Sequence, residues 1–304
     1  MDIHRLHLDT PKGSSAPSRS APSLGATISA AISAAGAELQ SLRFGDAEVL
    51  WDAGPLWPRH APLLFPIVGT LKGGSGFALP RHGFARDHAF AWISRSENAC
   101  VLELRDDAET RACYPFPFQL RVSYSLDEAG FHMGLELRNP GEGPLPASLG
   151  LHPAFRWPLA PGLAKSAHRL VFDEQEPGPL RRLDHEGLLT PAQHPTPILD
   201  RVLPLHDGLF SEDALLFLEP RSQGLRLEAE GGPALAFQWE GFQHLGIWAK
   251  PAEGPEAGPG FLCIEPWSGY ADPADWNGAF SDKPGSFVLA PGGSRRWSFG
   301  ISRA

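Results

Sequence analysis

Short runs of alternating apolar and polar residues, broken by glycine, proline, asparagine or aspartate, constrain the fold of this chain most strongly. In the clearest run, residues 130–139, Phe131, Met133, Leu135 and Leu137 alternate with polar or small neighbours. A period of two places the two sets of side chains on opposite faces of a β-strand. No uninterrupted helical periodicity reaches about 12 residues, the usual length of a well-signalled helix. The pattern predicts an all-β protein.

Neighbouring strands are expected to pair in antiparallel fashion. Residues 118–126 form a second alternating run, and the segment 126–130 supplies a turn, so 118–126 and 130–139 should form a hairpin. Two short strands are expected within residues 26–37. Further short strands are expected at 99–104, 214–218, 225–228, 234–239, 244–249, 261–264 and 297–301. No repeat at a fixed period is visible, which disfavours a propeller or solenoid. The fold class expected is a large antiparallel β-sandwich.

The chain has enough apolar material for one large domain. Nine tryptophans and eighteen phenylalanines among 304 residues supply a hydrophobic core and argue against a disordered chain, although 33 glycines and 31 prolines indicate many turns. Residues 11–22, PKGSSAPSRSAP, are small, polar and proline-rich. We therefore predict a flexible N-terminal lead-in over residues 1–23 and a single domain over residues 24–304.

Charge and composition exclude several partners and locations. A net charge of −9 disfavours a nucleic-acid partner, which would select a basic face. No stretch of about 18 apolar residues is present, so no membrane span is expected. The start of the chain lacks the apolar run of a signal peptide, so we expect a cytoplasmic protein. Three scattered cysteines without a CxxC pair predict free thiols rather than disulfides or a zinc site.

Common catalytic motifs are missing, and four other segments hold the candidate chemistry. GxGxxG, the P-loop, GxSxG and HExxH are all absent, which disfavours dinucleotide, P-loop, serine-hydrolase and zincin activities. The remaining segments are dense in aromatic residues, prolines and ionisable groups. They cover residues 57–72, 81–90, 150–158 and 261–272.

Glu265 is the first candidate catalytic residue. It follows the apolar run FLCI and precedes Pro266 and Trp267, so it is expected at a strand end where proline stops the ladder. Partial desolvation there would raise its pKa toward neutrality, as suits a general base. The alternative is a structural glutamate that accepts backbone hydrogen bonds in a loop.

His152 is the second candidate. It precedes Pro153, and Phe155 and Trp157 are expected to supply an apolar wall for a ring-shaped ligand. An imidazole there can act as a general acid near pH 7, or it can be a satisfied core residue. The other histidines, His60, His82, His88 and His244, show no metal-ligand spacing, so no metal is expected.

Taken together, these segments resemble the aldose 1-epimerase (mutarotase) family, in its less characterised bacterial branch. HGFARDHAF at 82–90 and FLCIEPWSGYAD at 261–272 are the most specific matches when found together. Other matches, in the same order along the chain, are GAELQSL at 36–42, APLLFPIVGTLKGG at 61–74, LGLHPAF at 149–155, FSEDALLF at 210–217, LGIWAKP at 245–251 and LAPGGSRRWSFGI at 289–301.

The resemblance implies a β-sandwich of the galactose mutarotase type and interconversion of the α and β anomers of a hexose. By position in the motifs, Glu265 is the base that takes the C1 hydroxyl proton, and His152 is the acid that protonates the ring oxygen. His82 is implied to hold sugar hydroxyls or share the proton work, and Asp213 to bind a hydroxyl. The implied partner is a small-molecule sugar, with no cofactor, and the chain is expected to be a monomer or homodimer.

Four aromatic residues are candidates for stacking on a sugar, and one position departs from the family pattern. Of Phe84, Phe155, Trp248 and Trp267, we expect Phe84 and Trp248 to belong to the core instead. Thr70 stands where relatives usually carry a sugar-binding arginine, which a hydroxyl cannot replace.

Three arginines near Thr70 in the sequence matter for the two alternative functions. Arg59, Arg81 or Arg86 can compensate for the missing arginine from adjacent loops. They are also the candidate cations for a hexose 6-phosphate epimerase, the first alternative function. The second alternative is a non-catalytic sugar-binding protein on the same fold.

Overall fold

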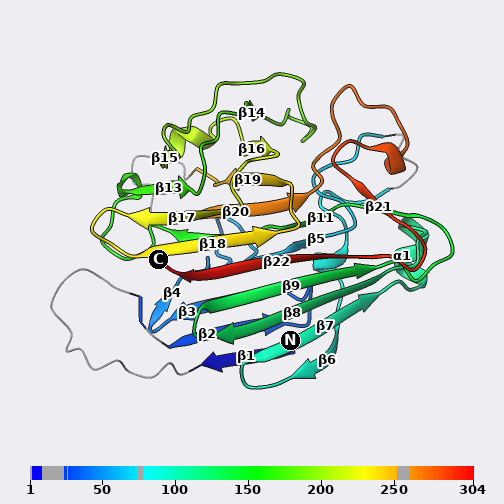
Figure 1. The fold of residues 1–304 in the computed structure, drawn as a ribbon, viewed down its shortest axis with the longest axis horizontal. Coiled ribbons are helices and arrows are strands. Elements are labelled where there is room, and N and C mark those ends of the chain that lie inside the picture. Colours follow the sequence, from blue (N-terminus) through cyan, green and yellow to red (C-terminus); the bar gives the residue numbers. More distant parts are fainter. Residues whose placement is uncertain (1, 9–23, 26, 74–77, 252–259) are drawn as a thin grey trace.

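Antiparallel β-sheets are the main elements of the computed structural model, which describes residues 2–8, 24–25, 27–73, 78–251 and 260–304 (Figure 1). The largest sheet has nine strands, in the order β15 (Val202–Pro204), β13 (His168–Phe172), β17 (Gly224–Ala229), β18 (Ala234–Glu240), β22 (Ser294–Arg303), β9 (Gly130–Arg138), β8 (Gln119–Asp127), β7 (Ala99–Arg105) and β6 (Ala91–Arg95). The second has seven strands: β14 (Leu180–Arg181), β16 (Leu215–Leu218), β19 (His244–Trp248), β20 (Gly260–Ser268), β11 (Leu149–Leu151) and β5 (Leu63–Leu64) in order, with β12 (Ala154–Trp157) also paired to β20.

The remaining elements are short. A four-stranded sheet contains β1 (Ile3–Leu8), β2 (Ile28–Ser33), β3 (Leu39–Phe44) and β4 (Ala47–Glu48), and a two-stranded sheet pairs β10 (Leu145–Ala147) with β21 (Phe287–Leu289). The helices are α1 (Ala108–Cys113) and the 3-10 turns η1 (Ala85–Asp87), η2 (Lys165–Ala167), η3 (Asp207–Phe210) and η4 (Phe280–Asp282). Every helix among the described residues is too short or too polar to cross a membrane.

One apolar core fills the space between the two large sheets. Phe155 of the seven-stranded sheet meets Phe237 of the nine-stranded sheet with ring centroids 4.7 Å apart, and Phe172 and Phe217 make a similar contact at 5.9 Å. These rings are buried, as the alternation in their strands requires. The predicted all-β antiparallel sandwich is therefore confirmed.

The predicted hairpin and most predicted strands are also confirmed. β8 and β9 pair in antiparallel register from Gln119–Arg138 to Asp127–Gly130. Each of the seven further strands expected from the short runs is present, with bounds that differ by a few residues.

Two predictions at the N-terminus are wrong. Residues 3–8 were expected in a flexible lead-in, but they form β1, which pairs with β2 from Ile3–Ser33 to Leu8–Ile28. Leu6 is buried in the core, so burial and ladder hydrogen bonds stabilise a segment whose own pattern is weak. The rest of the predicted lead-in, residues 9–23, lies outside the described residues. Within 26–37 the structure has one strand, β2, followed by a turn at Gly36 and Ala37.

Alternation along the seven-stranded sheet determines what its outer face presents. In β20, Leu262 and Ile264 point into the core, whereas Cys263, Glu265 and Trp267 point away from it. The neighbouring strand β19 behaves in the same way, with Leu245 and Ile247 in the core. The outer face is therefore built from the alternate residues of each strand, and it forms the floor of the pocket described next.

Candidate active site

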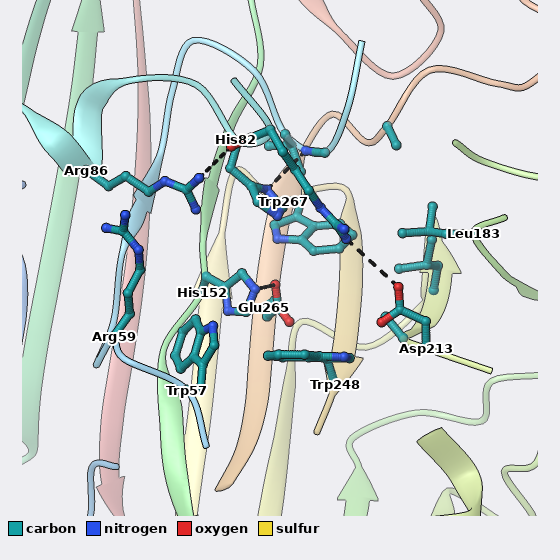
Figure 2. A pocket seen from close by; sticks show the side chains of 16 residues that line it. Trp57, Arg59, His82, Arg86, His152, Leu183, Asp213, Trp248, Glu265 and Trp267 are labelled. Atoms are coloured by element: carbon teal, nitrogen blue, oxygen red, sulfur yellow. Dashed lines mark hydrogen bonds and ion pairs between the residues drawn. The ribbon is translucent and has the colours of Figure 1, made fainter. Parts of the chain in front are cut away.

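A pocket of about 270 Å³ lies on the outer face of the seven-stranded sheet (Figure 2). It contains all four of the site residues predicted from the sequence, Glu265, His152, His82 and Asp213. Its other lining residues come from the loops before and after β5, from the loop after β14, from β16 and the residue before it, from β19, and from β20 and the loop after it. They are Trp57, Arg59, Val68, Gly69, Arg81, Arg86, Leu183, Ala214, Leu216, Trp248, Trp267 and Ala271.

Glu265 lies inside β20 and not at its end, so that part of the prediction is wrong. The strand continues through Pro266 to Ser268, and Glu265 pairs with Gly246 of β19. Ile264 donates its N–H to the carbonyl of Pro153, on the side of β20 where β11 and β12 lie. Alternate residues direct their amides to the same side, so the missing N–H of Pro266 faces the end of β11, at the gap between β11 and β12, and not β19. The ladder between β20 and β19 therefore continues past the proline.

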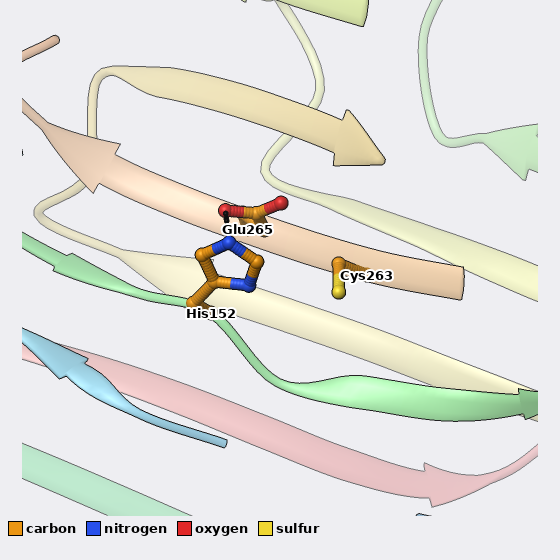
Figure 3. Close-up of side chains that lie close together, drawn as sticks. All are labelled: His152, Cys263 and Glu265. Atoms are coloured by element: carbon orange, nitrogen blue, oxygen red, sulfur yellow. Dashed lines mark ion pairs between the residues drawn. The ribbon is translucent and has the colours of Figure 1, made fainter. Parts of the chain in front are cut away.

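His152 occupies that same gap. Its N–H donates to the carbonyl of Pro62, which holds the residue between the two short strands. The imidazole Nε2 lies 3.2 Å from Oε2 of Glu265, and Figure 3 shows the two side chains next to each other, Glu265 on β20 and His152 on the neighbouring segment. Both residues are more than nine-tenths buried. β11 and β12 pair with β20 in the same register, so His152 lies directly opposite Glu265, and this brings the predicted acid and the predicted base into contact.

Burial changes the pKa of both groups in the direction that disfavours charge. It raises the pKa of Glu265 well above its ordinary value, and the nearby Arg81 opposes this only in part. It lowers the pKa of His152 to about 3, with smaller contributions from Arg86, Arg81 and Arg59. Both shifts favour a protonated Glu265 and an uncharged His152, so the pair carries one titratable proton and no net charge. A contact of this kind can pass the proton from one partner to the other without adding charge to the pocket.

His82 is a neutral hydrogen-bond donor. Its Nδ1 accepts the N–H of Gly69 at 3.1 Å, so the proton of the neutral ring is on Nε2. Burial, and then the neighbouring His152 and Arg81, hold the pKa of His82 well below its usual value. Its backbone is in the left-handed region, with φ of 69°, and the next residue, Gly83, would place a Cβ only 2.2 Å from the carbonyl oxygen of Phe65. The glycine of the HGFAR motif therefore fixes how His82 enters the pocket.

Trp267 forms the floor of the pocket. A Cβ on Gly150 of β11 would lie 2.5 Å from its Cδ1, and one on Gly246 of β19 would lie 2.6 Å from its Cη2. The indole therefore lies across the sheet on two glycines, one in each strand next to β20. Its buried Nε1–H has no hydrogen-bond partner among the described residues, so it is available to a ligand.

Aromatic rings also surround the imidazole of His152. Trp57 stacks on it with centroids 4.9 Å apart, and Trp248 meets it edge-on at 5.7 Å. Trp248 was expected in the core, but alternation in β19 turns it outward to the pocket wall. Phe155 and Trp157 were expected to form that wall, but both are completely buried in the core. Trp57 stands at the start of the predicted segment 57–72, where no role was assigned to it.

Phe84 packs in the core, as expected, against Phe65 and Phe118. The other histidines lie elsewhere. The ring of His60 bonds to the carbonyl of Trp51, that of His88 approaches Glu109, and that of His244 packs against Tyr270.

Three arginines converge on the pocket. Arg81 lies 3.9 Å from the carboxylate of Asp213, and Arg59 pairs with Asp87 at 2.8 Å. Arg86 donates to the carbonyl of Arg81, and burial together with Arg59 lowers its pKa. Thr70 is not part of the pocket lining, but a Cβ on Gly187 would meet both its Oγ1 and the guanidinium of Arg81, at 3.0 and 3.5 Å. The charge of Arg81 thus lies close to Thr70.

His152, Cys263 and Glu265 are the candidate metal ligands among the described residues, with donor atoms within 4.8 Å of one another. Figure 3 shows the thiol beside the acid–base pair. Burial and the charge of Glu265 raise the pKa of Cys263 well above its ordinary value, whereas a metal requires the thiolate. The cluster fits proton transfer better than metal binding.

Replacing Gly246 by alanine is expected to damage the pocket through Trp267. The new Cβ would lie 2.6 Å from the indole, which must move off the sheet. We expect a loss of about 1–3 kcal/mol of unfolding free energy, typical of overpacking, and a shift in tryptophan fluorescence. Gly143→Ala is the matched control, because a Cβ there meets nothing within 4 Å. Equal stability and fluorescence in the two variants would contradict this role of Gly246.

His244, outside the pocket, should make stability depend on pH. Burial, with a smaller effect of Lys283, lowers its pKa to about 4. Between that pH and about 6.5 the unfolded chain binds a proton that the folded chain does not, so stability rises with pH. The unfolding free energy of the wild type should therefore rise more steeply than that of His244→Gln, by up to about 1.4 kcal/mol per pH unit. Urea titrations at about pH 5 and pH 6 measure the difference. If the unfolding free energy depends on pH equally in the two proteins, then His244 ionises normally in the folded state.

Comparison with known proteins gives a consistent result. The family model for aldose 1-epimerase matches residues 23–286. The plasmid-encoded protein LacX of Lactococcus lactis subsp. lactis is 30% identical over 284 residues, which cover 88% of this chain and 93% of LacX. The crystal structure of a galactose mutarotase related enzyme from Lactobacillus acidophilus is 30% identical, with a TM-score of 0.82 over 91% of this chain and 94% of that one. A galactose mutarotase-like protein from Lactobacillus casei, 24% identical, shares the fold with a TM-score of 0.83 over 99% of this chain and 100% of its own.

Proposed function

Because the chain belongs to the aldose 1-epimerase family, we propose that it interconverts the α and β anomers of a free hexose by opening and reclosing the sugar ring. The observation that supports this most strongly is the contact between His152 Nε2 and Glu265 Oε2 in the pocket. An acid and a base in contact suit a reaction whose two proton transfers take place at oxygens bonded to the same carbon.

The pair acts as acid and base in turn. Once the proton of the pair has moved from Glu265 to His152, the carboxylate of Glu265 takes the proton of the C1 hydroxyl while His152 donates its own to the ring oxygen. The bond between C1 and the ring oxygen breaks, and C1 becomes an aldehyde carbon. After rotation about C1–C2, the reverse transfers close the ring on either face. The pair holds one proton before and after each step, so a buried pocket never gains net charge.

The other pocket residues bind the sugar. His82 Nε2 and Trp267 Nε1 donate hydrogen bonds to hydroxyls, and Asp213 accepts one at the opposite end of the pocket from Arg59 (Figure 2). The indole of Trp267 and the ring of Trp248 pack on the C–H faces of the sugar. These contacts involve no cofactor.

Optical rotation tests the proposal directly. Crystalline α-D-glucose or α-D-galactose, freshly dissolved, should reach equilibrium faster with the protein than in buffer alone. If folded protein leaves the rate unchanged for both sugars, the proposal is contradicted for these two hexoses.

A hexose 6-phosphate is the second candidate substrate, favoured by the convergence of Arg59, Arg81 and Arg86 on one pocket. Arg59 and Arg86 lie beside His152 (Figure 2), and C6 of a hexose adjoins the ring oxygen that His152 protonates. Anomeric exchange measured by NMR separates the candidates. A kcat/KM at least about tenfold higher for glucose 6-phosphate than for glucose would favour the phosphorylated substrate.

A further inference from the structure

Trp57 lines the pocket, and the mechanism described so far gives it no role. Its indole stacks on the imidazole of His152, with the ring centroids 4.9 Å apart and the ring planes 25° apart. Figure 2 shows the two rings next to each other, close to Glu265. The acid of the proposed reaction therefore contacts the base through Nε2 and an aromatic face through its ring.

The indole of Trp57 is held in this position by its own neighbours. Phe261 packs against it with centroids 5.3 Å apart, and Trp248 meets it edge-on at 5.8 Å. The backbone N–H of Trp57 donates to the carbonyl of Gly54 at 3.0 Å, and its carbonyl accepts the indole N–H of Trp51 at 2.8 Å. The stack on His152 is therefore formed before any substrate binds.

Ring contacts, and not a second hydrogen bond, orient the imidazole of His152. A catalytic histidine is commonly oriented by a hydrogen bond at the nitrogen that does not react. In His152 that nitrogen, Nδ1, is buried and has no hydrogen-bond partner in any other described residue. Instead, Trp57 covers a face of the ring, while Trp248 and His82 meet it nearly at right angles, at 5.7 and 5.6 Å. Of these three neighbours, Trp57 is the one that stacks on the imidazole.

The same stack acts on charge. In each ring opening the proton of the pair moves from Glu265 to His152, which is then an imidazolium. Burial opposes this state, as the lowered pKa of His152 reflects, and the three arginines of the pocket act in the same direction. A cation within about 6 Å of a tryptophan face is attracted by the negative charge of that face, most strongly where water is excluded. Trp57 meets this condition and opposes the effect of burial.

Resting on the proposed function, we infer that Trp57 is a positioning residue that stabilises the imidazolium form of His152 during ring opening. It acts through His152 and not through the sugar. Its removal should therefore lower kcat and leave KM nearly unchanged.

Two substitutions of similar size separate the aromatic face from the space that it fills. Trp57→Phe keeps a smaller aromatic face, whereas Trp57→Leu removes it. Anomer exchange measured by NMR, on the hexose that the wild type accelerates most, should show kcat lowered about threefold in Trp57→Phe and at least about tenfold in Trp57→Leu, with KM within about twofold in both. Trp92→Leu is the matched control, because Trp92 meets His4 edge-on at 5.7 Å in the edge strand β6, outside the pocket lining. It should change neither constant.

A second readout needs no substrate. In protein labelled with ¹³C and ¹⁵N at histidine, the imidazole shifts of His152 follow its protonation as pH is lowered from 7, and His152→Asn identifies its signals. The ring should take up its proton at a pH at least about 0.5 lower in Trp57→Leu than in Trp57→Phe.

The possible outcomes are distinct. Equal losses of kcat in Trp57→Phe and Trp57→Leu, a loss that lies in KM, or equal titration of His152 in the two variants overturns the role of Trp57 and leaves the epimerase proposal standing. If the wild type accelerates no hexose, the proposed function fails, and the titration alone then decides whether Trp57 stabilises the imidazolium.

Discussion

Glu265→Gln is expected to lower the rate of anomer exchange by at least about 10³-fold, close to the spontaneous rate. The amide keeps the shape of the side chain but cannot accept the C1 hydroxyl proton, and general acid–base catalysis contributes about 10²–10⁴-fold. Because burial raises the pKa of Glu265, the folded state resists ionisation at neutral pH, whereas the unfolded chain ionises freely above about pH 4.5. The wild type therefore loses unfolding free energy as pH rises above that value, and the neutral glutamine avoids this loss. The variant should therefore be inactive yet at least as stable as the wild type at pH 7, in polarimetry and urea unfolding respectively.

Cys263→Ser is the control for this result. Cys263 lies on the same face of β20 two residues before Glu265, and it belongs to the candidate metal cluster. If Glu265 and His152 alone carry out the proton transfer, the rate of anomer exchange in this variant should change by less than about fivefold. A loss as large as that of Glu265→Gln would instead implicate the thiol, and with it a metal, in the reaction.

His152→Asn has the second-largest expected effect, a loss of at least about 100-fold in kcat, because the ring oxygen loses its proton donor.

His82→Gln should behave differently. His82 is held as a neutral donor by the N–H of Gly69, and glutamine retains a donor, so this variant should mainly raise KM. Steady-state kinetics on the best hexose measure both. If kcat falls as far in His82→Gln as in His152→Asn, then His82 takes part in the proton transfer.

Much of the fold follows from the alternation in the sequence. The β8–β9 hairpin is encoded locally, in two periodic runs and the turn between them. β1 could not be predicted in the same way, because IHRLHL forms a strand only by pairing with β2, about 25 residues later. Alternation also indicates that Phe155 and Trp157 share one side of β12, but only the packing of the two sheets determines that this side is the core.

The acid and the base were predictable as residues but not as a pair. Glu265 and His152 were found through motifs, whereas their 3.2 Å contact depends on the register in which β11 and β12 pair with β20, which no local pattern indicates. Pro266 was predicted to end β20. It is tolerated inside the strand because its missing N–H faces away from β19, whose pairing with β20 continues past it. Leu183 reaches the pocket from a loop with no recognisable motif, so no signal in the sequence could have found it.

The central claim is that Glu265 and His152 together open and close a hexose ring. Magnetisation exchange between the α and β anomers at equilibrium, measured by NMR with wild type and Glu265→Gln side by side, tests it most directly. We expect exchange to be accelerated by the wild type and to fall to the buffer rate with the folded variant. Acceleration that persists in Glu265→Gln would contradict the account.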